Sequence, residues 1–372
     1  MQTCAVCAYS SAIVSTKQEV WVKGTNFNSH MGPPIINPGL LSNQPPATAK
    51  LDFPQPIISV CVGSFTSLFL AENGDVWMCG MSLVGRAVDE VPRQIANLPP
   101  IQAISCSSNY YHRKKARCLY LDVDGNVWKL VATRRKYRNG PRKIGKSSLP
   151  PIKSISAASR FSLFLDYEGN VWSQGNSSKG CLGFGDTLFQ KYPVKIPELC
   201  NIVEISSSEK CSLFLDKNGD VWMCGTDKYR GLVNFKARKP YKIQDLPPIR
   251  AISTGHRHSL FLDEEGRVWG RGANSRQTMG SMKDSKGNRM LYVLKPTLIS
   301  RMPGEMVGIK AGYRASFYID SEGSVWATGS NYWAQLIESE VDRSIIRKPT
   351  KIDFPPILIP QQSIYLKSAR NT

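Results

Sequence analysis

The stretch that decides the fold is Ser162-Leu163-Phe164-Leu165-Asp166-Tyr167-Glu168-Gly169-Asn170-Val171-Trp172. Two short apolar segments flank an Asp-x-x-Gly turn, a pattern typical of a β-hairpin. The glycine supplies the positive φ that such a turn needs. Related copies recur along the chain and end at seven tryptophans spaced 44 to 57 residues apart, namely Trp21, Trp77, Trp128, Trp172, Trp222, Trp269 and Trp326. Repeats of this length indicate a propeller or a solenoid, in which we expect each Trp to pack between neighbouring units.

A second phrase precedes most of the hairpins and reads Leu98-Pro99-Pro100-Ile101 before the third copy. Pro can open a strand without the loss of a ladder hydrogen bond, so this phrase predicts a further strand in each repeat. The first hairpin lacks the phrase, whereas a spare copy, Phe354-Pro355-Pro356-Ile357, follows the last hairpin. We therefore predict an all-β, seven-bladed β-propeller in which residues 1–372 form a single domain. Its ring is closed by the C-terminal strand, which completes the N-terminal blade and removes exposed sheet edges.

The repeat resembles that of the regulator of chromosome condensation family. The copy that ends at Trp172 continues to Gly180-Cys181-Leu182-Gly183-Phe184-Gly185-Asp186, and Gly255-His256-Arg257-His258-Ser259-Leu260 is similar to the family's Gly-x-x-His-Ser-Leu element. The resemblance covers nearly the whole chain and implies a seven-bladed propeller. It also implies two activities, guanine-nucleotide exchange on a small GTPase and binding to chromatin. The family's exchange factor uses an extra β-wedge, and no inserted hairpin is evident in this sequence.

The chain is strongly basic, with 48 Lys and Arg against 29 Asp and Glu and a formal net charge of +19. Such a charge favours acidic partners, including nucleic acid, anionic lipid headgroups and acidic protein surfaces. The five-residue turns of the seven hairpins hold 14 acidic and 3 basic residues, so the remainder of the surface is much more basic. We expect a basic loop face, defined as the face of the disc opposite the Asp-x-x-Gly turns.

Two patches on the loop face are candidate partner-binding sites. The third repeat carries an insertion and an altered loop that together form a basic patch, consisting of Arg113, Lys114, Lys115, Arg117, Arg134, Arg135, Lys136 and Arg138. The loops of the seventh, first and second repeats form an apolar arc, consisting of Phe27, Leu83, Val84, Tyr332 and Trp333. The basic patch suits phosphates or an acidic protein strip, and the arc has the aromatic composition of a protein-recognition surface. Each set can equally be ordinary solvated or inward-packed loop residues.

Signatures of catalysis are missing from the sequence. The histidines are His30, His112, His256 and His258, and none belongs to a Ser/His/Asp, Cys/His or metal-ligand motif. We expect His258 to cap a loop of its own blade, and we expect neither a cofactor nor a catalytic or metal site. Nucleotide exchange on a partner GTPase is the one enzyme-like activity that stays open.

The leading hypothesis is a protein-interaction propeller that binds an acidic protein partner through its loop face. Nucleotide exchange on a small GTPase is the first alternative, and docking to nucleic acid or chromatin through the basic patch is the second. The chain has no apolar run of the roughly 20 residues that a membrane helix requires, and no signal-peptide pattern at its start. We expect a soluble, monomeric protein inside the cell, in the cytoplasm or the nucleus.

Overall fold

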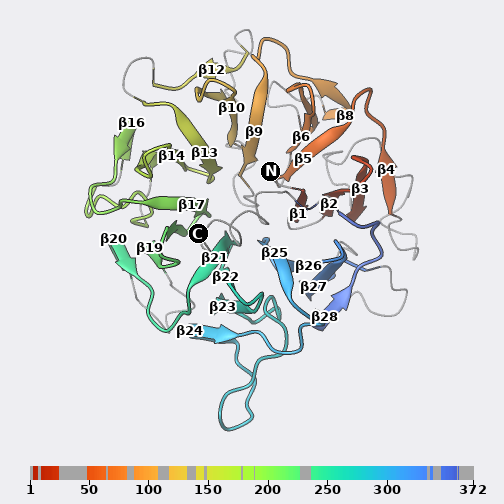
Figure 1. Ribbon diagram of the computed structural model, residues 1–372, viewed down its shortest axis with the longest axis vertical. Helices are drawn as coiled ribbons and strands as arrows, with labels where there is room; N and C mark the ends of the chain where they lie inside the picture. The colour runs from red at the N-terminus through yellow and green to blue at the C-terminus, as the bar shows by residue number, and fades with distance from the viewer. Residues whose placement is uncertain are drawn as a thin grey trace, which may run out of the picture.

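The computed structural model contains seven antiparallel sheets of four strands, arranged as the blades of a propeller (Figure 1). It describes residues 3–6, 10–24, 48–63, 66–81, 88–107, 117–131, 140–145, 149–176, 179–187, 189–226, 236–332, 336–337, 345–357 and 359. The predicted all-β, seven-bladed fold is confirmed. That residues 1–372 form a single domain stays a prediction. Among the described residues, no helix has the length and hydrophobicity to cross a membrane.

The first strand of each blade lies nearest the central axis and the fourth lies at the rim (Figure 1). Blades one to three consist of β1 (Cys4–Val6), β2 (Ser10–Val14), β3 (Val20–Gly24), β4 (Ala49–Leu51), β5 (Ile57–Val62), β6 (Thr66–Ala71), β7 (Val76–Met81), β8 (Val88–Gln94), β9 (Ile101–Cys106), β10 (Arg117–Asp122), β11 (Val127–Val131) and β12 (Arg142–Lys143). Blades four and five consist of β13 (Ile152–Ala157), β14 (Phe161–Asp166), β15 (Val171–Asn176), β16 (Phe189–Lys195), β17 (Ile202–Ser207), β18 (Cys211–Asp216), β19 (Val221–Thr226) and β20 (Lys236–Lys242). Blades six and seven consist of β21 (Ile249–Thr254), β22 (His258–Asp263), β23 (Val268–Ala273), β24 (Tyr292–Leu298), β25 (Met306–Ala311), β26 (Ala315–Asp320), β27 (Val325–Ser330) and β28 (Ile345–Lys351).

The turn aspartate organises each hairpin. In blade four, Asp166 Oδ1 accepts hydrogen bonds from the backbone N–H groups of Glu168 and Asn170, at 3.0 and 2.8 Å. Its Oδ2 accepts a bond of 3.0 Å from Trp172 Nε1, so one carboxylate holds both the turn and the indole. Gly169 has a φ of 81°, as the turn requires. The same bond from Trp to Asp, at 2.8 to 2.9 Å, recurs at Asp122, Asp216, Asp263 and Asp320.

The seven tryptophans join neighbouring blades, as predicted. Each half-buried Trp packs against the apolar core of the preceding blade; Trp222 of blade five, for example, contacts the cluster that includes Leu163 and Phe214. Trp21 of blade one packs against the core of blade seven in the same way and so joins the two ends of the chain. Burial of a Trp side chain removes up to 250 Å² of largely apolar surface from water, which makes these contacts the main apolar link between blades.

The first two blades depart from the turn pattern. Blade two has Ala71 at the aspartate position, and within the described structure Trp77 Nε1 is buried without a hydrogen-bond acceptor. Blade one has Ser15 there, and Trp21 Nε1 donates instead to Glu19 Oε2 at 3.3 Å. Blade one also has Gln18 at the glycine position, with a φ of 61°. These substitutions weaken the turns of the two blades that lie next to the closure.

Inner strands of adjacent blades are linked by hydrogen bonds from side chain to backbone. Ser156 Oγ of β13 accepts the Ser207 N–H of β17 at 3.0 Å. The same bond joins four further pairs of blades, with Cys61, Ser105, Ser206 and Ser253 as acceptors. The bonds satisfy backbone donors on the strands that line the central axis, which would otherwise lack partners within a sheet. They also set the position of each blade relative to the next.

Both ends of the described chain contribute to closure of the ring. Ile357 forms an antiparallel bridge with Ser15, and its N–H donates to Gly323 O at 2.9 Å. This is the place that the Pro-Pro-Ile phrase occupies elsewhere, since Ile101 N–H donates to Gly74 O. The regular inner strand of blade one, however, is β1 from the N-terminal side. The C-terminal segment therefore completes blade one as predicted, but it supplies only the beginning of the inner strand, and β1 supplies the rest.

Candidate functional site

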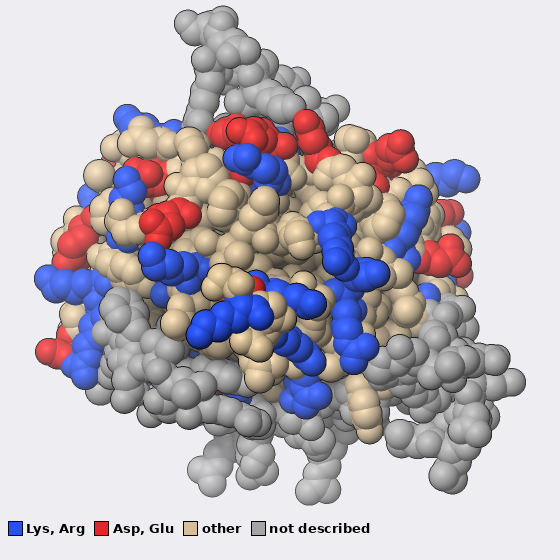
Figure 2. Space-filling view, turned by 90° about the horizontal axis from the view of Figure 1, so that it is seen from below, with Lys and Arg blue, Asp and Glu red and all other residues tan. Residues whose placement is uncertain are grey.

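The two faces of the disc differ in charge. Viewed from the side, Asp and Glu gather toward the upper edge of the molecule, whereas Lys and Arg dominate the middle and lower part (Figure 2). The acidic residues of the hairpin turns belong to one face, and the connections from first to second strand and from third to fourth strand emerge on the loop face. This separation agrees with the expectation from sequence that the positive charge is concentrated away from the turns.

A row of cations occupies one position of the repeat on the loop face. It comprises Arg160, Lys210, Arg257 and Arg314, which stand in the connections between the first and second strands of blades four to seven. We call these four residues the cation row. Arg257 and Arg314 are exposed, and Arg160 and Lys210 are half-buried. The carbonyl oxygen of each accepts a hydrogen bond of 2.8 to 2.9 Å from the backbone N–H of the residue that follows the Trp-x-x-Gly glycine of the same blade.

Close backbone approach explains why a glycine stands three residues after the Trp in blades four to seven. Gly272 has a φ of 112°, and a Cβ at this position would lie 2.5 Å from the carbonyl oxygen of Arg257. Gly329 makes the same approach to Arg314, with a φ of 116°. A side chain would force apart the contact that fixes each cation, because real Cβ atoms do not approach backbone oxygen so closely. The repeat thus fixes the backbone of the cation row on the loop face.

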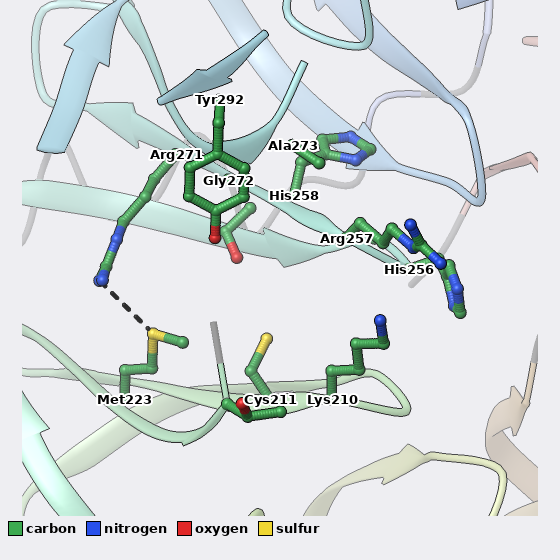
Figure 3. A pocket seen from close by; sticks show the side chains of 13 residues that line it. Lys210, Cys211, Met223, His256, Arg257, His258, Arg271, Gly272, Ala273 and Tyr292 are labelled. Carbon is green, nitrogen blue, oxygen red and sulfur yellow. Dashed lines mark hydrogen bonds between the residues drawn. The ribbon is translucent and has the colours of Figure 1, made fainter. Parts of the chain in front are cut away.

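A cleft lies between blades five and six beside the middle of the cation row (Figure 3). Figure 3 shows Lys210 extending from blade five toward Arg257 and His256 of blade six. The side chains that line the cleft include Lys210, Met223, Arg257, His258, Arg271 and Tyr292. Arg271 donates from Nη1 to the hydroxyl of Tyr241 at 3.0 Å, which holds its guanidinium at one side of the cleft.

The positive charges of the cleft act on one another. Burial, followed by the charges of Lys210 and Arg257, lowers the pKa of His256 to about 3. Its ring stacks on Tyr313 with centroids 4.4 Å apart, and its Nδ1 lies 3.7 Å from Glu209 Oε2. Burial and the neighbouring Arg257 also lower the pKa of Lys210. The imidazole is therefore neutral at pH 7, while the surrounding cations create a site that favours anions.

His258 joins blade six to blade seven. Its Nε2 lies 2.8 Å from Ser316 Oγ, and that hydroxyl donates its own hydrogen to Thr278 O at 2.6 Å. Because the serine hydrogen is used in this way, the Nε2 of His258 carries the proton that it donates to Ser316. Burial lowers the pKa of His258 to about 4, so the ring is neutral at pH 7. We expected His258 to cap a loop of its own blade; its partner is instead Ser316 of β26 in the next blade.

Family models match the chain in three places. Two repeat models described as the regulator of chromosome condensation (RCC1) repeat cover residues 57–86 and 249–277, and residues 168–215. These stretches fall in blades two, four to five and six, each across the hairpin phrase. The chain contains RCC1 repeats in these three stretches.

Two solved structures have the same fold. Prp20p from Saccharomyces cerevisiae, whose structure was described with its binding properties to Gsp1p and histones, has a TM-score of 0.73 at 19% identity, over 95% of this chain and 94% of that chain. Human WBSCR16 has a TM-score of 0.74 at 17% identity, over 92% of this chain and 95% of that chain. At such low identity the likeness concerns the fold alone.

One curated relative is a mouse protein named "RCC1-like G exchanging factor-like protein". It is 24% identical over 213 residues, which are 52% of this chain and 43% of the mouse protein. The match thus spans less than half the length of the mouse protein.

Most of the two predicted patches lies outside the described residues. Of the basic patch only Arg117 is described, and of the apolar arc only Tyr332. Arg117 donates to Ser162 Oγ at 3.1 Å and to Arg160 O at 3.0 Å, so it ties blade three to blade four. Burial lowers the pKa of its guanidinium. Tyr332 is 62% exposed just after β27, on the loop face. Both patches as binding sites stay predictions.

Reasoning from the repeat missed the cation row, although its signal was present. A basic residue stands two positions before the Ser of the hairpin phrase in four consecutive repeats, at Arg160, Lys210, Arg257 and Arg314. A second feature was also missed: Lys283 and Arg289 form an antiparallel bridge, which makes a short hairpin between β23 and β24. Within the described part of the chain, no group of three or more His, Cys, Asp or Glu side chains could hold a metal ion.

Proposed function

We propose that this RCC1-repeat propeller is an interaction module that binds an acidic protein partner through its loop face. The observation that supports this function is the cation row. Four consecutive blades present a cation at one repeat position, with the backbone fixed by the Trp-x-x-Gly glycines. Among the described residues, neither Lys210 nor Arg257 forms an ion pair with a carboxylate. A partner that supplies carboxylates or phosphates would neutralise this charge.

Charge complementarity of this kind governs specificity and association rate more than total affinity. The acidic turns on the opposite face repel the same partner, which favours one docking orientation. Exposed Tyr332, which belongs to the same blade as Arg314, adds an aromatic side chain of the type that forms hot spots. The loop face therefore combines a charged row with an aromatic contact.

The test is partner capture from nuclease-treated lysate with two variants of equal net charge. The first carries Lys210→Glu, Arg257→Glu and Arg314→Glu in the cation row. The control changes three exposed cations of the outer strands instead, by Lys195→Glu, Lys348→Glu and Lys351→Glu. We expect the control to retain the partner and the first variant to lose it, with both proteins equally folded by circular dichroism. Equal retention by both variants would refute docking through the cation row.

Guanine-nucleotide exchange on a small GTPase is the second candidate. It is favoured by the name of the mouse relative, which calls that protein a G exchanging factor-like protein. The short hairpin closed by the bridge between Lys283 and Arg289 is an element that could contact a GTPase from blade six. The measurement is release of a fluorescent guanine nucleotide from a GTPase with and without this protein. Acceleration that disappears when residues 283–289 are replaced by a Gly-Ser linker would support exchange, whereas an unchanged release rate would exclude it for that GTPase.

A further inference from the structure

The cleft between blades five and six has a feature that general attraction to acidic surfaces does not require. Two of its cations, Lys210 and Arg257, come from different blades and approach each other, whereas Arg271 lies at the other side of the cleft, where it donates to Tyr241 (Figure 3). Lys210 extends from blade five, and Arg257 and Arg271 belong to blade six (Figure 3). The hydroxyl of Tyr292 points into the same space between the blades. A flat acidic strip would meet exposed cations one at a time, whereas here Lys210 and Arg257 stand on the two sides of one cleft.

We propose that this cleft is a binding site for a phosphate monoester. A tetrahedral phosphate accepts hydrogen bonds in several directions at once. Arg donors recognise it with a planar fork, and Lys contributes a point charge. A planar carboxylate has only two oxygens and would leave part of this donor set unused. The proposal rests on the loop-face docking proposed above only for the source of the phosphate, which is either a phosphorylated side chain of the partner or a free phosphate compound.

The surroundings of the cleft support an anion of this kind. Lys210 and Arg257 have no carboxylate partner among the described residues, and the nearest acid, Glu209, lies beside His256. Because His256 and His258 are neutral at pH 7, they add no positive charge to the repulsion between the cations of the cleft. The backbone on both sides is fixed, because the carbonyls of Lys210 and Arg257 each accept a bond from the end of a third strand. Such preorganised donors bind an anion without ordering the chain first.

The first experiment measures inorganic phosphate binding by isothermal titration calorimetry at constant ionic strength, with chloride as the balancing anion. The test variant is Lys210→Gln with Arg257→Gln, and the control is Lys195→Gln with Lys348→Gln. We expect saturable binding by the parent and the control, and a dissociation constant raised at least tenfold in the test variant. Absence of binding by the parent, or equal binding by all three proteins, would overturn the proposal. Equal melting temperatures of the three proteins establish that the test variant is folded.

The second experiment distinguishes the two sources of phosphate. It compares a phosphoserine peptide with the same peptide that carries Glu in place of the phosphoserine. Tighter binding of the phosphopeptide than of inorganic phosphate would identify a protein source, and equal affinity of these two would identify a free phosphate compound. A Glu peptide that binds as tightly as the phosphopeptide would refute phosphate selection. The two proposals can fail independently. If the triple Glu variant of the cation row still captures the partner, but phosphate binding is lost in the variant of Lys210 and Arg257, then only the docking proposal is wrong.

Discussion

Replacement of Ala71 by Asp should stabilise the propeller. In five of the blades a turn aspartate accepts the indole N–H of its Trp, whereas Trp77 Nε1 of blade two is buried with no acceptor in the described structure. A buried donor without a partner costs about 1–3 kcal/mol. The new carboxylate would remove this cost and would also accept backbone N–H groups of the turn.

The expected gain is smaller than the sum of these bonds, for two reasons. The Asp75 N–H already donates to Asn73 Oδ1 at 3.0 Å, so one backbone bond would be exchanged rather than added. The new carboxylate must also be buried. Asp166 shows how these effects balance, because burial raises its pKa, but hydrogen bonds from Trp172 and Asn170 outweigh burial and the net pKa is lowered. We expect Ala71→Asp to stabilise the fold by about 1 kcal/mol at pH 7, in the range typical of a restored consensus residue.

The assay is urea unfolding followed by tryptophan fluorescence, supported by calorimetry. For a chain of this size, about 1 kcal/mol corresponds to a rise in Tm of only about 1 °C, so the urea midpoint is the primary measurement. A carboxylate with a lowered pKa stabilises above its unfolded pKa of about 4 and loses this contribution as pH falls through the folded pKa. The gain should therefore be full at pH 7 and smaller at pH 3. A variant less stable than the parent at pH 7, while Ala71→Asn is more stable, would refute the reasoning.

Four further outcomes are expected. Trp222→Ala should destabilise the fold by about 3–5 kcal/mol, because it leaves a cavity between blades four and five, and an unchanged urea midpoint would contradict that contact. Gly272→Ala should cost about 2–4 kcal/mol through backbone strain and the clash with the Arg257 carbonyl; a stable variant by calorimetry would show that the backbone can relax there. Because the pKa values of His256 and His258 are lowered in the folded protein, the unfolded chain binds protons at a higher pH than the folded protein does. The free energy of unfolding should therefore be highest above about pH 6.5. Toward pH 4 it should fall by up to about 1.4 kcal/mol per pH unit for each His. Urea unfolding at pH 7.5 and pH 5 checks this dependence, which should weaken when both histidines are changed to Gln. A chain that ends after Asp353 should melt at a lower temperature than the parent, since it lacks the bridge at the closure, and equal melting would show that β1 alone suffices.

The repeat phrase was sufficient to predict the number of blades, the hairpins and the packing of Trp222 and its equivalents, because each depends on residues close together in the chain. The sequence did not predict that two separate segments form the inner strand of blade one. The Pro-Pro-Ile phrase is missing before Ile13, and nothing else indicated that Cys4–Val6 forms a strand. Sequence spacing also could not show that Arg117 bonds to Ser162, a contact that exists only once blades three and four are packed.

The candidate site shows the same limit. Each member of the cation row is visible in the sequence as one basic residue of a repeat, but the cleft arises only where Lys210 and Arg257 meet across a blade boundary. The insertion in the third repeat, where the pattern is most altered, led to the prediction of a binding site there. A comparison of one repeat position across all seven copies would instead have placed the candidate site on blades four to seven.

The closure has a consequence for how the protein is made. Ser15 leaves the ribosome early, whereas Ile357, to which it bridges, is added after the strands of all seven blades have been synthesised. At about 5–20 residues per second, the nascent protein waits on the order of tens of seconds with the inner edge of blade one incomplete. During that interval the partly built propeller exposes unpaired backbone that other nascent chains can join. Molecular chaperones that protect strand edges should therefore matter most just before the ring closes.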